Sequence, residues 1–595
     1  MMCGVSGEVR FDGGLADPAA VNRMSVTQRH RGPHGEGLWQ QGRVALGHRR
    51  LKIIDLSDRG AQPMVDPELG LAVAFNGCLY NYQELRQELQ AAGYRFFSSS
   101  DTEVILKAYH RWGTDCVQHF LGMFAFAITE RDGGRVVLAR DRLGIKPLYL
   151  AQTPGRLRFA SSLPALLAAG DVDTSIDPVA LHHYLTFHSV VPAPRTILAG
   201  IRKLPPATVR VIEPDGASRD EVYWTPRHER NPEHSGLSVP QWQELVLDSL
   251  RTAVRRRMVG DVPVGVLLSG GLDSSLIVAL LAQEGQTGLQ TYSIGFDDHG
   301  GVEGNEYHYS DLIAREYGTE HHKIHIQTAH VLEQLEGTIE AMSEPMVSHD
   351  CVAFYSLSEE VAKGVRVVQS GQGADEVLAG YDWYPPLAGV PADDAVDAYA
   401  RVFFDRPHDV LARILEPGWM LDHDPSRQFV AEHFARAGAG TALDKALRLD
   451  STVMLVDDPV KRVDNMTMAW GLEARVPFLD HEFVELAASV PPELKLAHDG
   501  KGVLKDAARS VLPAEVIDRP KGYFPVPAIS QLGGRQLERV REALAAPEAK
   551  ERRLFRQEYV DLLLRTPNEH RTTLGSNQLW QLGLLEMWLQ RHGIG

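Results

Sequence analysis

The chain is 595 residues long, with 44% hydrophobic and 23% charged residues and a net charge of −17 at neutral pH. This length exceeds what a single hydrophobic core supports, so two or three domains are expected. The negative charge argues against nucleic acid or an anionic membrane as a partner. No apolar run approaches the roughly 18 residues that cross a bilayer.

Cysteine usage indicates a reducing compartment. Cys3, Cys78, Cys116 and Cys351 show neither a C-x-x-C spacing nor a zinc pattern with histidine. The N-terminus lacks a basic segment followed by an apolar core, so no signal peptide is predicted. These features predict a cytoplasmic protein.

Short strands and turns dominate the first third of the chain. The apolar run 71–75 predicts a strand, and Asn76-Gly77 predicts a tight turn that interrupts it. Ser100 is a helix-capping residue type, so a helix is expected from Asp101 onward. This part of the chain therefore favours a fold of many short strands with a few helices.

A polar stretch separates the two halves. Residues 226–238 lack apolar periodicity, and we place the linker at 216–238. An amphipathic helix is then predicted over 241–258. The expected domains are 3–215 and 239–595.

The second half is organised around residues 261–275, D-V-P-V-G-V-L-L-S-G-G-L-D-S-S. The pattern predicts a buried strand, a glycine turn at 269–271, and a helix from Leu272. Backbone N–H groups of such a turn and the helix N-terminus attract an anion such as a phosphate. Asp273 beside a phosphate implies an intervening cation such as Mg²⁺. The alternative is a plain strand-to-helix turn, and the spacing is not that of a Walker loop.

Strands and helices alternate after this turn. Strands are predicted at 289–296, 322–326 and 365–368, and helices at 309–317 and 331–341. Alternation predicts a parallel sheet with ligands beyond the carboxyl ends of its strands. The segment 370–376, S-G-Q-G-A-D-E, directly follows one of these strands and is a second candidate for ligand contact.

The order and spacing of these motifs resemble known families. Segments 30–33, 75–77 and 141–149 are similar to the glutaminase domain of class II glutamine amidotransferases, and the turn at 269–275 is similar to the pyrophosphate loop of ATP pyrophosphatases. As a whole the chain resembles the glutamine-hydrolysing asparagine synthetases. The resemblance implies a two-domain protein of α/β and α+β class. An N-terminal-nucleophile four-layer αββα sandwich would precede a doubly wound parallel-sheet ATP-pyrophosphatase domain with a helical C-terminal part.

The resemblance implies that Cys3 is a nucleophile whose own α-amine is the base. Cys3 would attack the side-chain amide of glutamine and release ammonia. Two methionines precede it. A Met-Met pair is not removed by the ordinary loss of one initiator Met, so we expect that translation starts at Met2 or that both residues are lost.

The other glutaminase residues are carried over from the same resemblance. Asn76 (side chain) and Gly77 (backbone N–H) would stabilise the oxyanion. Arg50 would bind the α-carboxylate of glutamine, which suits a two-pronged donor. Asp101 would hold the α-ammonium group, with a plain helix cap as the alternative, and Cys78 would make a weak backbone contact.

The resemblance also implies an ATP site with Mg²⁺. The matched ATP residues are Leu267, Ser269, Gly270, Gly271, Asp273, Ser274, Ile294, Ser370, Gly371 and Lys521. Asp273 and Asp375 would hold Mg²⁺, and Lys521 would meet the charge of the departing pyrophosphate. The second domain would adenylate a carboxylate, and ammonia would pass inside the protein and displace AMP.

The acceptor is the open part of this interpretation. Gln372 stands where asparagine synthetases usually carry a carboxylate that can accept a proton, which an amide cannot do. With 161–164, 343–350 and 381–386, this resembles the N-acetylglutaminylglutamine amidotransferase branch, which amidates a capped dipeptide osmoprotectant. Aspartate is the alternative acceptor. The expected partners are small molecules, namely glutamine, ATP and the acceptor carboxylate.

Two other classes of protein would keep part of the same sequence pattern. β-Lactam-forming relatives keep both domains without needing the glutaminase, and the presence of Cys3 argues against them. A non-enzymatic glutamine or nucleotide sensor would keep the pockets without turnover. The sequence leaves a homodimer open.

Overall fold

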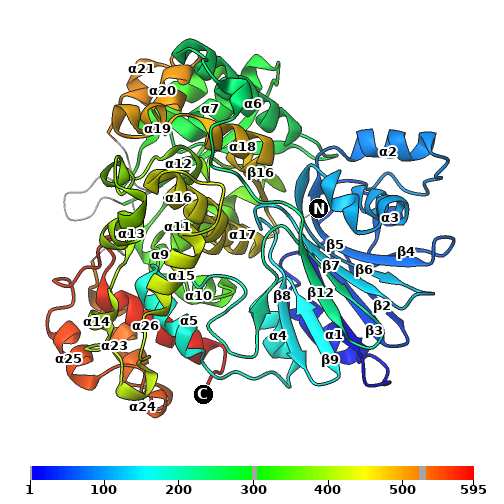
Figure 1. Ribbon diagram of the computed structural model, residues 1–595, viewed down its shortest axis with the longest axis horizontal. Helices are drawn as coiled ribbons and strands as arrows, with labels where there is room; N and C mark the ends of the chain where they lie inside the picture. Colours follow the sequence, from blue (N-terminus) through cyan, green and yellow to red (C-terminus); the bar gives the residue numbers. More distant parts are fainter. Residues whose placement is uncertain (1–2, 298–303, 521–530) are drawn as a thin grey trace.

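The computed structural model describes residues 3–297, 304–520 and 531–595. Two stacked β-sheets form the N-terminal part, beside a larger and mostly helical part that contains the third sheet (Figure 1). The coarse prediction of two domains, with a parallel sheet in the second, is confirmed. Every helix among the described residues is too short or too polar to cross a bilayer.

The two N-terminal sheets are six-stranded and antiparallel. The first has the order β10-β8-β9-β1-β3-β2 and contains β1 (Gly4–Arg10), β2 (Glu36–Gln41), β3 (Val44–Arg49), β8 (Tyr149–Thr153), β9 (Arg156–Ala160) and β10 (Arg202–Lys203). The second has the order β12-β11-β7-β6-β5-β4 and contains β4 (Met64–Asp66), β5 (Leu71–Leu79), β6 (Gly122–Glu130), β7 (Val136–Arg140), β11 (Thr208–Ile212) and β12 (Ser218–Val222).

Residue alternation along β5 explains why both of its faces are buried. Ala72 and Ala74 pack in the core between the two sheets. Val73 and Phe75 point the other way, into the core beneath α2 (Tyr82–Ala91) and α3 (Asp101–Trp112). Small side chains on the inner face let the sheets approach. On the other sheet, α1 (Pro18–Thr27) and α4 (Leu163–Ala169) cover the outer face.

The predicted turn at Asn76-Gly77 is wrong, because β5 continues through both residues to Leu79. Gly77 pairs with Phe124 in the neighbouring strand. A Cβ atom on Gly77 would lie 2.1 Å from the carbonyl oxygen of Met123. Glycine is therefore required by the close approach of β6, and Asn76 is held in a strand interior.

The expected linker begins with a strand. β12 pairs with β11 at the edge of the second sheet, and all of its residues are exposed. Its sequence S-R-D-E-V is polar because an edge strand faces solvent on its open side. The polar composition of this segment is therefore also that of a linker, although the segment forms a strand. The following helix α6 (Val239–Arg256) begins with a capping box formed by Ser238 and Gln241.

The third sheet is parallel, with the order β15-β14-β13-β16-β17. Its strands are β13 (Val264–Leu267), β14 (Gln290–Phe296), β15 (Glu320–Ile326), β16 (Val367–Gln369) and β17 (Glu473–Arg475). The helices α7 (Leu272–Gln283), α8 (Tyr307–Tyr317) and α11 (Asp350–Val361) connect or flank these strands. The helix predicted over 331–341 is divided into α9 (Thr328–Glu333) and α10 (Leu335–Ala341) at Gln334, whose side chain donates to Glu359 of α11.

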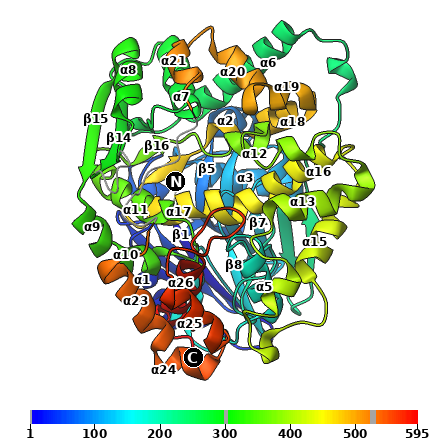
Figure 2. The same cartoon turned by 90° about the vertical axis from the view of Figure 1, so that its left-hand side faces the viewer.

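Helices form the rest of the second domain. They include α13 (Ala395–Phe403), α14 (His408–Leu411), α15 (Pro425–Phe434), α16 (Ala442–Leu449), α17 (Lys461–Met468), α23 (Gly534–Ala545), α24 (Pro547–Arg552), α25 (Gln557–Arg565) and α26 (Gln578–Arg591). One helix of the first half, α5 (Pro178–Thr186), lies among them, away from the N-terminal sheets (Figures 1 and 2). The Tyr184 hydroxyl donates to the backbone oxygen of Gln581 at 3.0 Å.

Candidate functional site

Cys3 directly precedes β1 and is fully buried. Its backbone N–H donates to Oδ1 of Asn76 at 2.9 Å. Nδ2 of Asn76 is buried and has no hydrogen-bond partner among the described residues. Since a buried donor without a partner is costly, this amide is suited to a ligand oxygen.

Arg50 follows β3 and has a similar surplus of donors. Its guanidinium donates to the backbone oxygens of Ser57, at 2.8 Å, and of Asp55. Its Nε atom is buried without a partner in the described part of the chain. The loop therefore holds the two terminal nitrogens of the Arg50 guanidinium, and Nε remains as a donor for another group.

Asp101 is the first residue of α3, but it does not cap the helix. The Ser100 hydroxyl accepts from the N–H of Thr102 at 3.2 Å, and Asp101 instead accepts from the N–H of Leu79 at 3.2 Å. Asp101 is fully buried, and this burial raises the pKa of its carboxyl. The carboxylate thus faces β5, the strand that carries Asn76 and Gly77.

Burial also governs the two thiols of this region. It raises the pKa of Cys3 to about 11 and that of Cys78 to about 12. The Cys3 thiol is therefore neutral at pH 7 and needs a base when it attacks. Cys78 Sγ lies 3.6 Å from Nη2 of Arg475, which comes from β17 of the second domain.

The turn after β13 builds the second site. Gly270 has a φ of +79°, and a Cβ atom there would lie 2.7 Å from the backbone nitrogen of Ser310. Gly371, in the turn after β16, approaches the first turn closely, since a Cβ atom on it would lie 3.0 Å from the Cβ atom of Asp273. The two glycine-containing turns therefore pack against each other at the carboxyl ends of β13 and β16.

A cavity of about 160 Å³ lies at this point. The predicted residues that line it are Leu267, Ser269, Gly271, Asp273, Ser274, Ile294, Ser370, Gly371, Gln372 and Asp375. Gly270 lies within the same turn, and Lys521 lies outside the described residues. The expected set thus converges from three neighbouring strands, as in other open parallel sheets.

Lys501 joins the two predicted metal carboxylates and was missed by sequence reasoning. Its Nζ lies 2.8 Å from Oδ2 of Asp273 and 3.0 Å from Oδ1 of Asp375. These two carboxylates raise the pKa of the buried ammonium group. Two carboxylates so close together fit a divalent cation as well as a lysine. Lys501 gave no local signal, because packing alone brings it to a turn some 230 residues earlier.

A larger cavity of about 980 Å³ continues from the first. Its walls include aromatic side chains and four lysine or arginine side chains, namely Phe187, Tyr381, Trp383, Phe403, Arg462, Lys501, Lys505 and Arg519. One wall is an unusual helix of two successive π-type turns, Asp450–Met454 and Val456–Val460, with Pro459 inside. Such turns widen the spacing of side chains and recur at functional sites.

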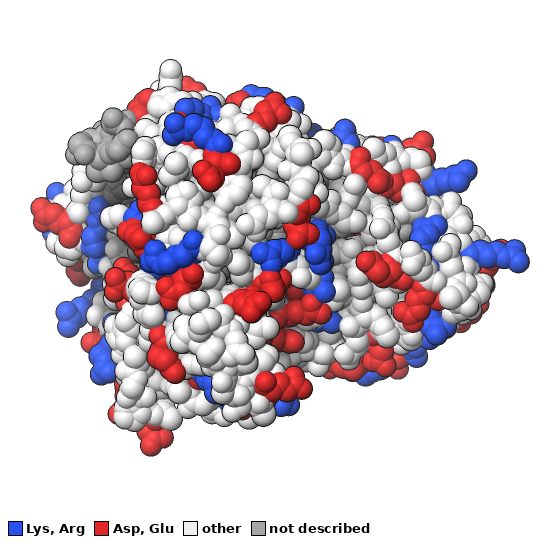
Figure 3. Space-filling view, turned by 90° about the horizontal axis from the view of Figure 1, so that it is seen from above, with Lys and Arg blue, Asp and Glu red and all other residues white. Residues whose placement is uncertain are grey.

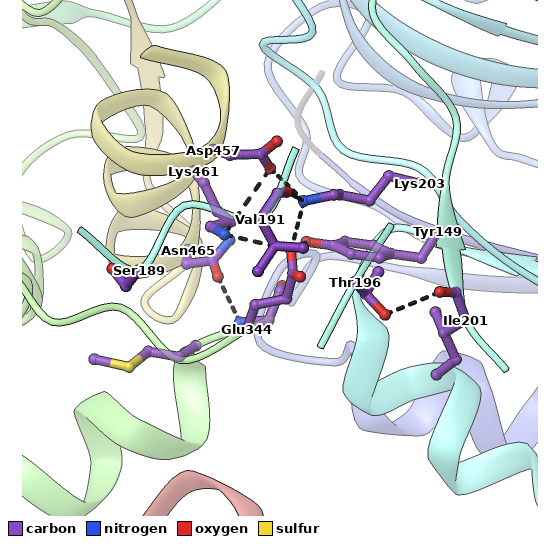
Figure 4. Close-up of polar contacts among 12 residues, drawn as sticks. Tyr149, Ser189, Val191, Thr196, Ile201, Lys203, Glu344, Asp457, Lys461 and Asn465 are labelled. Carbon is purple, nitrogen blue, oxygen red and sulfur yellow. Dashed lines mark hydrogen bonds and ion pairs between the residues drawn. The ribbon is translucent and has the colours of Figure 1, made fainter. Parts of the chain in front are cut away.

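The two domains meet through buried ion pairs (Figure 4). Lys203 of β10 lies 3.0 Å from Glu344 and 2.7 Å from Asp457, both in the second domain. Lys461 of α17 approaches the same Glu344 at 3.3 Å. All four side chains are at most 4% exposed. Two cations and two carboxylates balance in charge, as burial requires. We call Lys203, Glu344, Asp457 and Lys461 the interface cluster.

α17 contacts both sites. Asp464 accepts from Arg31 at 2.9 Å and Lys146 at 3.1 Å, and Arg31 also donates to the backbone oxygen of Cys3 at 3.3 Å. Two residues earlier, Arg462 lines the larger cavity. One rigid helix therefore links the Cys3 region to the cavity of the second domain, and Figure 2 shows it beside the N-terminal strands.

Fold and sites together define a glutamine amidotransferase domain joined to a parallel-sheet synthetase domain. Residues 2–224 match the glutamine amidotransferase domain family, and residues 245–590 match the asparagine synthase family. Asparagine synthetase [glutamine-hydrolyzing] 3 of Bacillus subtilis is 31% identical over 88% of this chain and 87% of its own. Asparagine synthetase [glutamine-hydrolyzing] 1 of the same organism is 31% identical over 96% of this chain and 92% of its own.

The chain belongs to the family of glutamine-hydrolysing asparagine synthetases, which uses ATP. It is a ligase that forms a carbon–nitrogen bond with glutamine as the amido donor. A fungal relative, amidase chry2 of Gibberella zeae, is 26% identical over 90% of both chains. A relative with a different name is therefore also similar over most of both domains.

Proposed function

We propose that Cys3 hydrolyses glutamine in the first domain. The thiol is neutral, so the α-amine of Cys3, once freed of the preceding methionines, takes its proton as the thiol attacks the amide carbon. Asn76 Nδ2 and the backbone N–H of Gly77 stabilise the oxyanion, and the unpartnered state of Asn76 Nδ2 supports this role. Arg50 and Asp101 hold the two charged groups of the glutamine, with Cys78 beside them.

In the second domain, the turn from Ser269 to Ser274 and the Ser370-Gly371 pair hold the ATP phosphates, with Leu267 and Ile294 against the base. Asp273 and Asp375 would hold Mg²⁺, which would neutralise charge on the phosphates. Lys501, between these carboxylates, keeps them in place and provides a fixed positive charge for the adenylated acceptor. Lys521 meets the leaving pyrophosphate.

We propose N-acetylglutaminylglutamine as the acceptor carboxylate, and the size of the second cavity carries this proposal. Its volume of about 980 Å³ is large for one small amino acid, even with room for the ATP phosphates. Of the four lysine and arginine side chains in its wall, Arg462, Lys501 and Arg519 are paired with acidic side chains. The fourth, Lys505, donates to the backbone oxygen of His498. Aspartate brings a second carboxylate and an ammonium group that need partners, whereas the capped dipeptide brings neither.

Aspartate is the second candidate, because the curated relatives are named asparagine synthetases. The test is release of pyrophosphate and AMP from ATP–Mg²⁺ and glutamine, with each acceptor separately. Turnover with the dipeptide and background release with aspartate are expected. The reverse result overturns the choice of acceptor and leaves the glutaminase and ATP assignments intact. Background release with every carboxylate, while ATP binds, would favour a sensor.

A further inference from the structure

Three metal-ligating side chains meet outside the set of residues that line the two cavities of the second domain. His182 lies on α5, His408 begins α14, and Asp424 precedes α15. One ligand atom from each lies within 4.8 Å of the others. His182 is 1% exposed, whereas the Asp424 side chain is 22% exposed. The cluster is thus half-buried and accessible to an ion from one side.

The spacing fits a tetrahedral zinc ion. His182 Nε2 lies 2.9 Å from His408 Nδ1 and 3.9 Å from Asp424 Oδ1. Two ligands bound about 2.0–2.1 Å from zinc at a tetrahedral angle lie roughly 3.3–3.4 Å apart. The two observed distances fall on either side of that value, so small rotations of the side chains suffice.

Hydrogen bonds orient the ligands. Nδ1 of His182 contacts the Ser426 hydroxyl at 2.8 Å, which directs Nε2 toward His408. The facing nitrogens of the two imidazoles cannot both carry a proton at 2.9 Å, so one lone pair already points into the cluster. Outer partners of this kind fix the tautomer of zinc-bound histidines. Asp424 Oδ1 also accepts from the N–H of Arg427 at 2.9 Å, which holds the carboxylate in place.

We propose that His182, His408 and Asp424 bind Zn²⁺, with water as a fourth ligand. The ion would tie α5, which belongs to the first half of the chain, to two helices more than 220 residues later. α5 leads directly into Phe187 and His188, which line the larger cavity. His188 in turn contacts Asp405, three residues before His408, at 2.9 Å. The zinc site therefore fixes one wall of that cavity, and it does not depend on which acceptor is used.

The test uses the full chain, stripped of metal and kept in millimolar Mg²⁺ to saturate carboxylate-only sites. Zn²⁺ is titrated against a coloured chelator, and thermal unfolding is followed with and without it. The variants His408→Gln and Asp424→Asn each remove one ligand, and asparagine still caps α15. His119→Gln, an exposed histidine of the first domain, is the matched control.

One Zn²⁺ per chain is expected for the wild type and His119→Gln, with a higher melting temperature in its presence. At least a tenfold loss of affinity is expected for both ligand variants. The zinc X-ray absorption spectrum should show two imidazole ligands with oxygen ligands. Equal zinc affinity in wild type and His408→Gln, or no zinc binding at all, would overturn the site.

Discussion

In the glutaminase domain, Cys3, Asn76 and Asp101 are fully buried, and strand pairing fixes the neighbourhood of Asn76. In the synthetase domain, Asp273 and Asp375 are each 20% exposed, and they lie on turns that open into a large cavity. In the proposed function, the first site takes the side-chain amide of glutamine beside the buried thiol of Cys3. The second site admits a nucleotide and an acceptor and releases three products. Strand register therefore sets the first site, and turns and ion pairs set the second.

The charge on the surface does not distinguish the two domains. On the face drawn in Figure 3, basic and acidic side chains are interspersed over both domains. What separates the domains is internal, namely a buried cluster around Cys3 between sheet and helices and an open cavity at the end of a parallel sheet. Changes inside each of these regions should therefore affect one half of the proposed reaction and spare the other.

The largest effect is expected from Cys3→Ala. Loss of the nucleophile should reduce glutamine hydrolysis by at least about 10³-fold. Amide formation from added ammonia should continue, because the synthetase site is untouched. The measurement is glutamate release beside AMP formation, with glutamine or ammonium chloride as donor. Cys116→Ala, a buried cysteine of the same domain, is the control. Undiminished glutaminase activity in Cys3→Ala would refute the assignment.

Lys501→Met should have the reverse effect. The substitution removes the buried ammonium group that contacts both carboxylates, and breaking such a buried pair costs about 3–5 kcal/mol. AMP formation should fall by about 10²-fold or more, while glutamine hydrolysis measured without ATP stays unchanged. Lys505→Met is the matched control, since Lys505 lines the same cavity one helical turn later. A normal rate of AMP formation in Lys501→Met would leave this lysine without a role in the reaction.

The sequence predicted the strands and turns of these sites better than the ion pairs that join distant segments. The family resemblance predicted Leu267, Ile294 and Ser370 for one site. They line one cavity, since parallel strands end at one edge of a sheet. The strand around Asn76 was misread, because an Asn-Gly pair is a strong local turn signal and the close approach of β6 cannot be seen in the sequence. Lys501 and the interface cluster were missed, because each joins residues more than 100 positions apart. Local patterns specify strands and turns, whereas long-range packing decides which charges meet.

Lys203→Met tests whether the interface cluster couples the two regions. It leaves Glu344 and Asp457 with Lys461 as their remaining partner in the cluster, so the domain interface should loosen. We expect the ratio of glutamate to AMP to rise several-fold above that of the wild type, as ammonia escapes before use. Arg202→Met, at the neighbouring and more exposed position, should change little, because surface ion pairs contribute about 0–1 kcal/mol. An unchanged ratio in Lys203→Met would show that the cluster is structural only.

The smallest effect is a pH dependence within the glutaminase domain. His48 on β3 is fully buried, and its Nε2 lies 3.1 Å from the backbone oxygen of Phe75, next to Asn76. Burial lowers the pKa of His48 from 6.5 to about 3. Between pH 3 and pH 6.5, His48 is therefore protonated in the unfolded chain and neutral in the folded chain. His48 therefore favours folding above pH 6.5, and this contribution is lost as the pH falls toward 3.

The loss amounts to at most about 1.4 kcal/mol per pH unit for one group. His48→Gln cannot gain that proton, so its free energy of unfolding should fall less steeply between pH 6.5 and 5 than that of the wild type. Urea unfolding at several pH values measures the two slopes, and His110→Gln, exposed on the same domain, gives the background. Identical slopes for wild type and His48→Gln would mean that His48 takes up a proton in the folded chain. The core of the glutaminase domain would then be more accessible than its burial indicates.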